Sequence, residues 1–357
     1  MITTIERGGA ENQLLILVRE QISLGFKVEI WFLKGRPELK EAFETAGAAV
    51  NEQLSDKQFI LQVLYFRKYL REIPGVNFVH AHLPQAELLV ALALSRQSRF
   101  FVTRHFGGQF LPRGNPFVSA LLSQFATRKA LRVIAISESV RQVILSKHEI
   151  LNPEKVVKIF YGFDTQEFLK AVDRNKWENP REKIVIGTVA RLSIEKNLKT
   201  LIQAFGLFAL GQENVELRIV GEGPLKVELQ KLAIDLNIQD KVNFLGKQSD
   251  IPEVICTFDV FVLPSFFEGF GMVLLEAMAV GRRIIVANNS AMVEVIGTSG
   301  AGMFFETQSA DDLAKGIQEI LKSDLEFMRR AQKRQLEFFS ANKMAKSVVE
   351  LYESARH

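Results

Sequence analysis

Short apolar runs rich in β-branched residues alternate with longer amphipathic stretches along most of the chain. A strand of a parallel sheet is buried on both faces and is a continuous apolar run, whereas a covering helix is apolar on one side only. The alternation therefore predicts an α/β protein whose parallel sheets carry helices on both faces. The expected strands are Val28–Phe32, Phe78–His80, Phe100–Thr103, Val133–Ile136, Val156–Ile159, Ile184–Ala190, Glu216–Val220, Val242–Phe244, Val260–Leu263, Ile284–Val286 and Gly302–Phe304.

The pattern occurs twice, on either side of the polar stretch Gln166–Glu182, whose second part, Asp173–Glu182, is a predicted linker. A length of 357 residues also fits two domains of ordinary size. We therefore expect two Rossmann-like domains, 1–165 and 183–338. A final helix, about 340–357, could pack back on the first domain.

Composition and the start of the chain limit the class of protein. Hydrophobic residues are 47% and charged residues 24%, which argues against a disordered or fibrous chain. Only Met1–Ile5 precede the first glycine turn, so either the first strand is short or the native chain begins upstream. These residues lack the features of a signal peptide, and the longest apolar run, Leu88–Leu94, is too short to span a bilayer. A single cysteine, Cys256, fits a reducing compartment, so we expect a cytoplasmic protein.

Positive charge is concentrated in the first half of the chain. The formal net charge is +4, but Met1–Asp164 carry 21 Lys and Arg against 15 Asp and Glu. This basic half could face an anionic membrane surface or an anionic substrate, although ordinary surface charge explains it equally well. The chain has no run of five Lys or Arg, no zinc-finger spacing and no RNA-recognition motif, so we expect no nucleic-acid partner.

The richest candidate site follows the expected strand Val260–Leu263. The glycine-containing loop Glu268–Gly271 opens a helix at Met272, and backbone N–H groups at such a helix start form an anion site. The carboxylates of Glu268 and Glu276 suit sugar or ribose hydroxyls, since they would repel phosphates. Alternatively, Glu276 is a solvated helix residue and Glu268 merely lies near the helix start.

A second candidate follows the expected strand Ile184–Ala190. Arg191 comes directly after this strand, and Lys196 precedes the next helix. Two cations at the carboxyl edge of a parallel strand suit a diphosphate, because open α/β sheets bind ligands at that edge. The alternative is that both cations are exposed and pair with Glu195 or other acids.

Three further loops could line the same kind of pocket. Gly221 lies in a tight strand-to-helix turn that lacks the complete dinucleotide-binding spacing. Lys247 and Gln248 follow another strand and could flank a base. Gly9 precedes the first helix of the chain, where it could lie beside a phosphate or simply form an ordinary turn.

Three histidines, His80, His82 and His105, follow neighbouring expected strands in the first domain. This position suits a site, although a single histidine is more often a packed or an exposed residue. Their spacing matches no zinc motif, no cysteine pair supports a metal, and no Asp-x-Asp motif is present. We therefore expect no metal.

Together, these motifs resemble the family 4 glycosyltransferases. The resemblance rests on Gly-x-x-x-Arg-Leu from Gly187, Glu-Lys-Asn from Glu195, Val-Gly-Glu-Gly-Pro from Val220, and Glu-Gly-Phe-Gly-x-x-x-x-Glu-Ala-Met-Ala-x-Gly from Glu268. The chain departs from the family at Tyr161, where Asn is usual, and in the segment that begins at Asn288, where a glycine-rich turn is usual. The family has the GT-B fold, in which two Rossmann-like parallel-sheet domains face each other across a cleft.

The resemblance implies a retaining transferase that takes a sugar from a nucleotide-diphosphate donor and needs no metal or other cofactor. The implied catalytic residues are Glu268, Lys196, Arg191 and His105. Arg191 and Lys196 would hold the diphosphate, Glu268 would bind sugar hydroxyls, and His105 would approach the sugar from the other domain. Further donor contacts are implied for Gly9, Gly221, Lys247, Gln248, Gly269, Phe270, Gly271, Met272, Val273 and Glu276. His82 would lie near the acceptor.

The acceptor is expected to be a saccharide or a lipid-linked molecule of cell-surface polysaccharide, lipopolysaccharide or glycolipid synthesis. The apolar and basic stretch Phe117–Arg132 suggests peripheral docking on the anionic inner face of the cell membrane, although its apolar side could also be core. A soluble acceptor, a sugar-nucleotide epimerase and a non-catalytic nucleotide-sugar-binding protein are the alternatives. The sequence does not choose between UDP and GDP donors.

Overall fold

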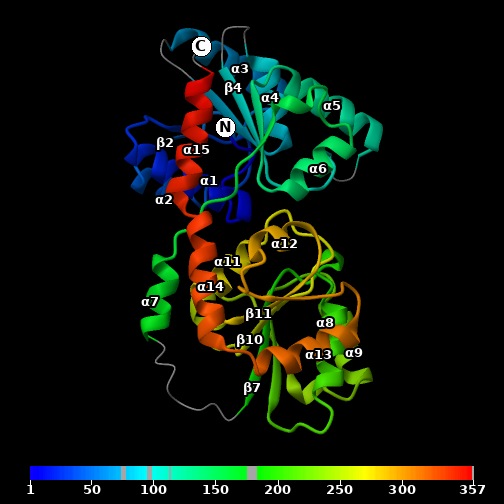
Figure 1. Ribbon diagram of the computed structural model, residues 1–357. Helices are drawn as coiled ribbons and strands as arrows, with labels where there is room; N and C mark the ends of the chain where they lie inside the picture. Colours follow the sequence, from blue (N-terminus) through cyan, green and yellow to red (C-terminus); the bar gives the residue numbers. More distant parts are fainter. Residues whose placement is uncertain (74–77, 95–98, 112–113, 175–182, 356–357) are drawn as a thin grey trace. The chain divides into compact units, whose positions relative to one another are not determined.

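The computed structural model describes residues 1–73, 78–94, 99–111, 114–174 and 183–355 (Figure 1). The chain divides into two compact units, each with its own parallel strands. Unit 1 comprises Met1–Phe163 together with Phe339–His357, and unit 2 comprises Asp164–Phe338. The α/β class with parallel sheets that the sequence predicts is confirmed.

Unit 2 is built on a six-stranded parallel sheet in the order β12-β11-β10-β7-β8-β9. Its strands are β7 (Ile184–Val189), β8 (Val215–Val220), β9 (Val242–Gly246), β10 (Val260–Leu263), β11 (Arg283–Ala287) and β12 (Met303–Phe305). The chain adds strands outward from β7 to β9, and then returns to the other side of β7 to add β10 to β12. This is the strand order of the Rossmann fold, in which ligands bind at the carboxyl edge where the direction changes. That switch point lies between β7 and β10.

Two groups of helices pack around this sheet (Figure 1). In the first group, α8 (Leu198–Phe208) packs against α9 (Lys226–Asp235) and α13 (Ala310–Leu321). In the second, α11 (Met272–Ala279) packs against α10 (Ile251–Cys256), α12 (Ser290–Ile296), α14 (Leu325–Phe338) and α7 (Gln166–Arg174). The helix α8 illustrates why these helices form, because its buried residues recur at a helical period and make one apolar stripe. They include Leu198, Leu201, Ile202, Phe205 and Phe208.

Unit 1 has a four-stranded parallel sheet in the order β3-β4-β5-β6 and a separate parallel pair, β1-β2. The strands are β1 (Glu29–Trp31), β2 (Ala49–Asn51), β3 (Phe78–His82), β4 (Arg99–Arg104), β5 (Arg132–Ala135) and β6 (Val156–Lys158). Ile2 joins the two sets through parallel bridges to Phe32 and His82. The amide of Ile2 donates to the carbonyl of Trp31 over 2.8 Å, and the amide of His82 donates to the carbonyl of Met1 over 2.9 Å. The first residues of the chain therefore act as a very short strand between β1 and β3.

The helices of unit 1 also fall into two groups. On one side, α3 (Phe59–Glu72), α4 (Pro84–Ala93) and α5 (Pro116–Arg128) pack in succession, and α6 (Glu138–Ser146) contacts β5 and β6. Elsewhere, α1 (Gly9–Ser23) contacts α2 (Lys40–Thr45) and the C-terminal helix α15 (Ala341–Ser354), as Figure 1 shows. A shared core of Leu17, Phe101, Ile134, Ala345 and Val348 holds α15 in this unit.

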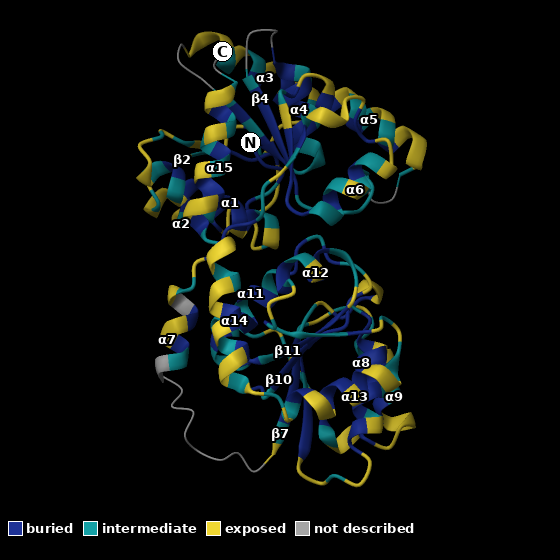
Figure 2. Ribbon diagram, viewed as in Figure 1, coloured by how far each residue is buried: buried dark blue, intermediate teal, exposed yellow. Residues whose placement is uncertain are grey.

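Two expectations from the sequence need adjustment. The polar stretch Gln166–Glu182 is not linker throughout, because it begins with the helix α7; residues 175–182 lie outside the described part of the chain. The strand β2 was not expected, since its three residues are exposed or half-buried and carry no apolar run. Figure 2 shows the contrast with the sheet of unit 2, whose strands are mostly buried. Within the described ranges, no helix has the length and apolar character needed to cross a membrane.

Candidate active site

The two candidate groups of unit 2 follow neighbouring strands at the switch point. Arg191 and Lys196 lie in the segment between β7 and α8, and Glu268 lies in the loop between β10 and α11. Because β7 and β10 are adjacent and parallel, these two segments emerge side by side at the carboxyl edge of the sheet. The structure therefore brings Lys196 and Glu268 together, although they are 72 residues apart in the chain.

Lys196 and Glu268 form a partly buried ion pair. The Nζ atom of Lys196 lies 2.7 Å from Oε1 of Glu268, and the two side chains are 21% and 11% exposed. The hydroxyl of Ser265 donates a second hydrogen bond, also of 2.7 Å, to the same Oε1 atom. Both bonds end on one oxygen, so Oε2 of Glu268 accepts no hydrogen bond from the described part of the chain. That oxygen can accept a bond from a ligand hydroxyl.

Arg191 is exposed directly after β7 and is close enough to Glu195 to act on its carboxyl group. The positive charges of Arg191 and Lys196 both lower the pKa of Glu195. Burial tends to raise the pKa of the Glu195 carboxyl, but a hydrogen bond from the Ser193 hydroxyl opposes it. With the two cations nearby as well, the pKa of Glu195 lies below its ordinary value. The segment thus keeps Glu195 ionised and holds a local surplus of positive charge.

Two further hydrogen bonds tie the segment after β7 to the loop after β10. The side-chain amide of Asn197 donates to the carbonyl of Pro264 over 3.1 Å, and the amide of Phe266 donates to the carbonyl of Glu195 over 2.9 Å. Asn197 has a φ of +50°, in the left-handed region that asparagine tolerates better than most residues. Sequence reasoning assigned no role to Asn197 or Ser265. Their hydrogen bonds join the segment that carries Lys196 to the loop that carries Glu268 and hold the Glu268 carboxylate.

The loop after β10 ends at a glycine that starts α11. Gly271 has a φ of +85°, which a side chain would strain, and no side chain of the described residues caps the helix. The N-terminus of α11 carries the positive end of the helix dipole, and its first turn contains no acidic residue. The neighbouring candidates Gly269, Met272, Val273 and Glu276 are half-buried, and Phe270 is buried. The arrangement suits an anion at the helix tip, with the Glu276 carboxylate one turn further along.

The turn after β8 lies against the end of β7. Gly221 has a φ of +126°, and a Cβ atom there would lie 2.0 Å from the carbonyl oxygen of Ala190. Only glycine permits this approach, and the Gly221 amide donates to the carbonyl of Gly246 over 2.8 Å. The adjacent Lys247 is exposed and Gln248 is half-buried. These residues therefore belong to the same edge of the sheet as Lys196.

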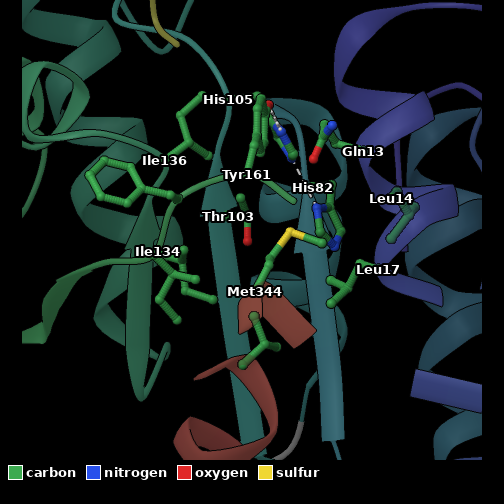
Figure 3. Close-up of a pocket in the computed structure, with 13 residues that line it drawn as sticks. Gln13, Leu14, Leu17, His82, Thr103, His105, Ile134, Ile136, Tyr161 and Met344 are labelled. Atoms are coloured by element: carbon green, nitrogen blue, oxygen red, sulfur yellow. Dashed lines mark hydrogen bonds between the residues drawn. The ribbon is translucent and has the colours of Figure 1, made fainter. Parts of the chain in front are cut away.

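In unit 1, the predicted histidines form a chain of hydrogen bonds at the carboxyl edge of the sheet (Figure 3). Nδ1 of His82 lies 2.9 Å from Nε2 of His105, and Nδ1 of His105 lies 2.5 Å from the hydroxyl of Tyr161. A neutral imidazole has one donor and one acceptor nitrogen, so the bonds of His105 must run in one consistent direction. Tyr161, which departs from the family pattern, is thus the residue that orients His105.

Burial keeps these histidines neutral. It lowers the pKa of His105 to about 3, and it lowers the pKa values of His80 and His82 well below the ordinary value. His82 is only 2% exposed, so its ring supports His105 from inside unit 1. His80 forms a second branch, with bonds to the hydroxyls of Tyr352 (2.6 Å) and Thr103 (2.7 Å).

A small pocket lies beside this chain. Its volume of about 20 Å³ is enough for one water molecule. Its lining includes Gln13, Thr103, His105, Tyr161 and Met344. Gly9, another predicted donor contact, is the first residue of α1, where a Cβ atom would meet nothing within 4 Å. In the part of the chain that the structure describes, no group of three or more His, Cys, Asp or Glu side chains could hold a metal ion.

A buried ionic cluster anchors the segment that carries His105. The guanidinium of Arg104 lies 2.9 Å from Oε2 of Glu87 and 2.9 Å from Oε2 of Glu149. Oε1 of Glu149 accepts the Phe110 amide over 2.8 Å. Burial raises the pKa of the Glu87 carboxyl to about 7, because the opposing effect of the Arg104 cation is smaller and the nearby Glu149 carboxylate adds to the rise. The cluster therefore fixes both ends of the segment from Arg104 to Phe110, and sequence reasoning did not find it.

Two family models match the chain in succession. The model described as Glycosyltransferase Family 4 matches residues 7–167, and the model described as Glycosyl transferases group 1 matches residues 170–337. Together they cover nearly the whole chain.

Known relatives agree with these matches. An uncharacterized glycosyltransferase of Methanocaldococcus jannaschii is 32% identical over 66% of this chain and 63% of its own length, so the chain spans less than two thirds of that relative. An N-acetylgalactosaminyltransferase of Campylobacter jejuni, whose name gives a diphospho-undecaprenol-linked saccharide as its acceptor, is 25% identical over 93% of this chain and 91% of its own length.

The fold agrees as well. The crystal structure of HepE from Anabaena in complex with UDP superimposes with a TM-score of 0.83, with 20% identity over 99% of this chain and 98% of HepE. Family models, relatives and fold all point the same way, and the chain belongs to the family 4 glycosyltransferases, enzymes of the GT-B fold that transfer sugars from nucleotide sugars.

Proposed function

We propose that this protein is a retaining glycosyltransferase that moves a hexosyl group from a nucleoside-diphosphate sugar to a saccharide or lipid-linked acceptor of cell-surface polysaccharide or glycolipid synthesis. The observation that carries the proposal is the Lys196–Glu268 pair at the switch point of unit 2, which joins the segment after β7 to the loop that opens α11. A cation and a carboxylate at this edge offer a nucleotide sugar two kinds of contact. Positive charge attracts its diphosphate, and the carboxylate accepts bonds from its hydroxyls.

The donor-binding roles that we propose are those that the family resemblance implies, and this arrangement supports them. Lys196 and Arg191 hold the diphosphate, whose oxygens also accept bonds from the backbone at the start of α11. Oε2 of Glu268 accepts a hydroxyl of the donor sugar, and Glu276 accepts the ribose hydroxyls. The remaining predicted contacts line the same edge of unit 2, namely Gly221, Lys247, Gln248, Gly269, Phe270, Gly271, Met272 and Val273.

The chemical step places new negative charge on the departing diphosphate. The bond between the anomeric carbon and the phosphate oxygen breaks, and its electron pair goes to that oxygen. Arg191, Lys196 and the positive end of α11 stabilise this charge, and groups that are already in place need little reorganisation during the reaction. These groups are fixed in place by the loop-to-loop hydrogen bonds of Asn197 and Phe266.

Retention follows from attack on the face that the diphosphate leaves. The acceptor oxygen bonds to the anomeric carbon, and its proton passes to the departing phosphate oxygen. A double displacement would instead need a carboxylate nucleophile beneath the ring. Glu268 has one oxygen engaged by Lys196 and Ser265, and we assign it a binding role rather than that of a nucleophile.

In unit 1, we assign His105 to the donor sugar and Gly9 to the phosphates, as the family resemblance implies. His82 is buried beneath His105, so we assign it to the support of His105 and only indirectly to the acceptor. Tyr161 completes this support from the other ring nitrogen.

A lipid-linked acceptor is supported by apolar side chains on the surface of unit 1. On α5, Phe117 is 70% exposed, and Leu121 and Phe125 follow it on the same helix face. On α3, Ile60 is 73% exposed and lies beside the exposed Leu61 and Leu64. Figure 2 shows exposed residues along the outer side of α5.

The helix α5 follows β4, so Phe117 in its first turn lies toward the carboxyl edge of the sheet that carries His105. The exposed cation Arg128 on α5 suits an anionic lipid surface, whereas the exposed Lys68 on α3 is paired with Glu72. The Campylobacter relative is named for an acceptor on a lipid diphosphate carrier. We therefore propose peripheral contact with an anionic membrane.

Flotation with vesicles tests this contact. The full chain should float with vesicles of phosphatidylglycerol at low salt and much less with pure phosphatidylcholine. The double variant Phe117→Ser and Leu121→Ser should lose binding, whereas Val227→Ser, an equally exposed apolar residue of unit 2, should not. The membrane proposal would be contradicted if the double variant and Val227→Ser floated equally, or if the wild-type protein did not float at all.

A donor screen tests the function itself. We expect one of UDP-glucose, UDP-galactose, UDP-N-acetylglucosamine and GDP-mannose to raise the melting temperature most and to be hydrolysed slowly without an acceptor. Conversion of a nucleotide sugar to an epimer would identify an epimerase instead. Binding of a donor without turnover, with any saccharide or lipid-linked acceptor supplied, would identify a binding protein.

A further inference from the structure

A closed ring of hydrogen bonds links the loop after β11 to Glu268. The Glu268 amide donates to Oγ of Ser290 over 3.0 Å, and the Ser290 hydroxyl donates to Oδ1 of Asn289 over 2.8 Å. Nδ2 of Asn289 donates to the carbonyl of Ser265 over 3.2 Å. The Ser265 hydroxyl then returns to the Glu268 carboxylate over 2.7 Å. Glu268 is thus held at its backbone and at its side chain by one continuous set of bonds.

Ser290 adopts a backbone conformation that costs free energy. Its φ is +49°, in the left-handed region that L-residues with a Cβ atom avoid, at a cost of about 1 kcal/mol or more. Glycine would occupy this position without strain. Glycine, however, has no hydroxyl to accept the hydrogen bond from the Glu268 amide. A glycine at position 290 would therefore break the ring at that bond.

A further hydrogen bond connects the ring to a third loop of unit 2. Nδ2 of Asn289 also donates to the hydroxyl of Thr307, after β12, over 2.8 Å. The loop after β10, the start of α12 and the segment after β12 are therefore joined at one edge of the sheet. The Ser290 hydroxyl bonds to the Glu268 backbone, whereas Lys196, which belongs to the segment after β7, bonds to the Glu268 carboxylate.

We propose that Ser290 is a positioning residue, which holds the Glu268 backbone so that the carboxylate meets the donor sugar in the reactive geometry. The inference rests on the proposed function. Ser290 acts through Glu268 on the sugar, whereas the diphosphate is held by Arg191, Lys196 and the tip of α11. The loss of its hydroxyl should therefore weaken turnover of a nucleotide sugar more than binding of the nucleotide alone.

The test compares Ser290→Gly with Ser290→Ala. Both remove the hydroxyl, but only glycine relieves the strain at positive φ. We expect Ser290→Gly to match or exceed the melting temperature of Ser290→Ala. Both should lower kcat/KM for hydrolysis or transfer from the best donor of the screen by about tenfold to a hundredfold. Their Kd values for UDP or GDP, measured by calorimetry, should stay within about twofold of the wild-type value.

Ser323→Ala is the matched control. Ser323 follows α13 at the opposite edge of the sheet, and its half-buried hydroxyl donates to the main-chain carbonyl of Ile320 in that helix. We expect its kcat/KM to equal that of the wild type. Wild-type turnover in Ser290→Gly would overturn the positioning role, as would losses of turnover that track the melting temperature across all three variants. If the wild type itself neither binds a nucleoside diphosphate nor transfers a sugar, the proposed function fails instead.

Discussion

The Nζ atom of Lys196 and the Oε1 atom of Glu268 lie 2.7 Å apart and join the segments that follow two adjacent parallel strands. The pair has two consequences for a nucleotide sugar. It places a cation that can bind the diphosphate next to a carboxylate that can accept hydrogen bonds from hydroxyls. It also leaves Oε2 of Glu268 without a hydrogen bond from the described residues. Both groups are preorganised before a ligand arrives.

Removal of either partner should abolish most activity without unfolding the chain. We expect Lys196→Ala and Glu268→Ala each to lower sugar transfer by about a hundredfold or more, since each loses a contact with the charge or the hydroxyls of the donor. Circular dichroism and thermal melting should show a folded protein. The matched controls are Lys199→Ala, an exposed lysine on α8, and Glu228→Ala on α9, which should keep wild-type rates. Turnover like that of the wild type in Lys196→Ala or Glu268→Ala would remove that residue from the mechanism.

Tyr161→Phe should uncouple His105 from its orienting partner. The variant removes the hydroxyl that lies 2.5 Å from Nδ1 of His105 and leaves this nitrogen of the half-buried ring without its bond. We expect slower sugar transfer with unchanged UDP or GDP binding, and altered ¹⁵N shifts of the His105 ring. Tyr352→Phe breaks the comparable bond to His80 and should lower stability with little effect on transfer. Equal effects of the two variants on transfer would contradict the special place of Tyr161.

The buried histidines should make the protein less stable in acid. Their folded pKa values are lowered, to about 3 for His105, so below the ordinary value of 6.5 only the unfolded chain takes up these protons. The free energy of unfolding should therefore fall as the pH drops from about 6.5 toward 3, by about 1.4 kcal/mol per pH unit for each histidine. Urea unfolding at several pH values measures this slope. His80→Gln should make it shallower by about one proton, and an unchanged slope would contradict the account.

Glu87 should act in the opposite direction. Burial raises its folded pKa to about 7, so between about 4.5 and 7 the folded chain holds a proton that the unfolded chain has lost. This contribution to stability is present below about pH 4.5 and is lost as the pH rises through 7. Glu87→Gln should therefore steepen the acid dependence that the histidines cause. A slope that does not steepen would show that Glu87 is ionised in the folded protein at lower pH.

Loss of the Arg104 charge should lower the free energy of unfolding more than loss of the Glu87 carboxyl. Arg104→Leu leaves the carboxylates of Glu87 and Glu149 buried without a cation, which should cost about 3–5 kcal/mol of unfolding free energy. Glu87→Gln keeps the Arg104–Glu149 pair and should cost much less at neutral pH. Chemical denaturation of the two variants checks the order, and a similar loss in both would contradict it.

The sequence predicted the fold best where both faces of a strand are buried. The strand β10 was expected at its observed bounds, because Val260–Leu263 is apolar throughout. The strand β2 was missed, since Ala49–Asn51 is short and partly exposed at the end of its sheet. The role of the first residues as a very short strand was not visible in the sequence, because it rests on tertiary hydrogen bonds, from the Ile2 amide to the Trp31 carbonyl and from the His82 amide to the Met1 carbonyl.

The residues of the candidate site likewise fall into those that the sequence could predict and those that only the structure shows. Glu268, Lys196 and Gly271 could be found because their residue types and spacing follow recognisable strands. The roles of Asn197 and Ser290 could not, because they depend on backbone dihedrals and on bonds between loops that are distant in sequence. Tyr161 stood out as a departure from the family, but its partner His105 is 56 residues away and only the fold brings them together.

A crystal structure of the full chain soaked with UDP or GDP tests the central claim most directly. We predict that the diphosphate lies at the N-terminus of α11, within hydrogen-bond distance of Lys196 and Arg191, with the ribose near Glu276. A nucleoside diphosphate bound elsewhere, with the tip of α11 empty, would contradict the account.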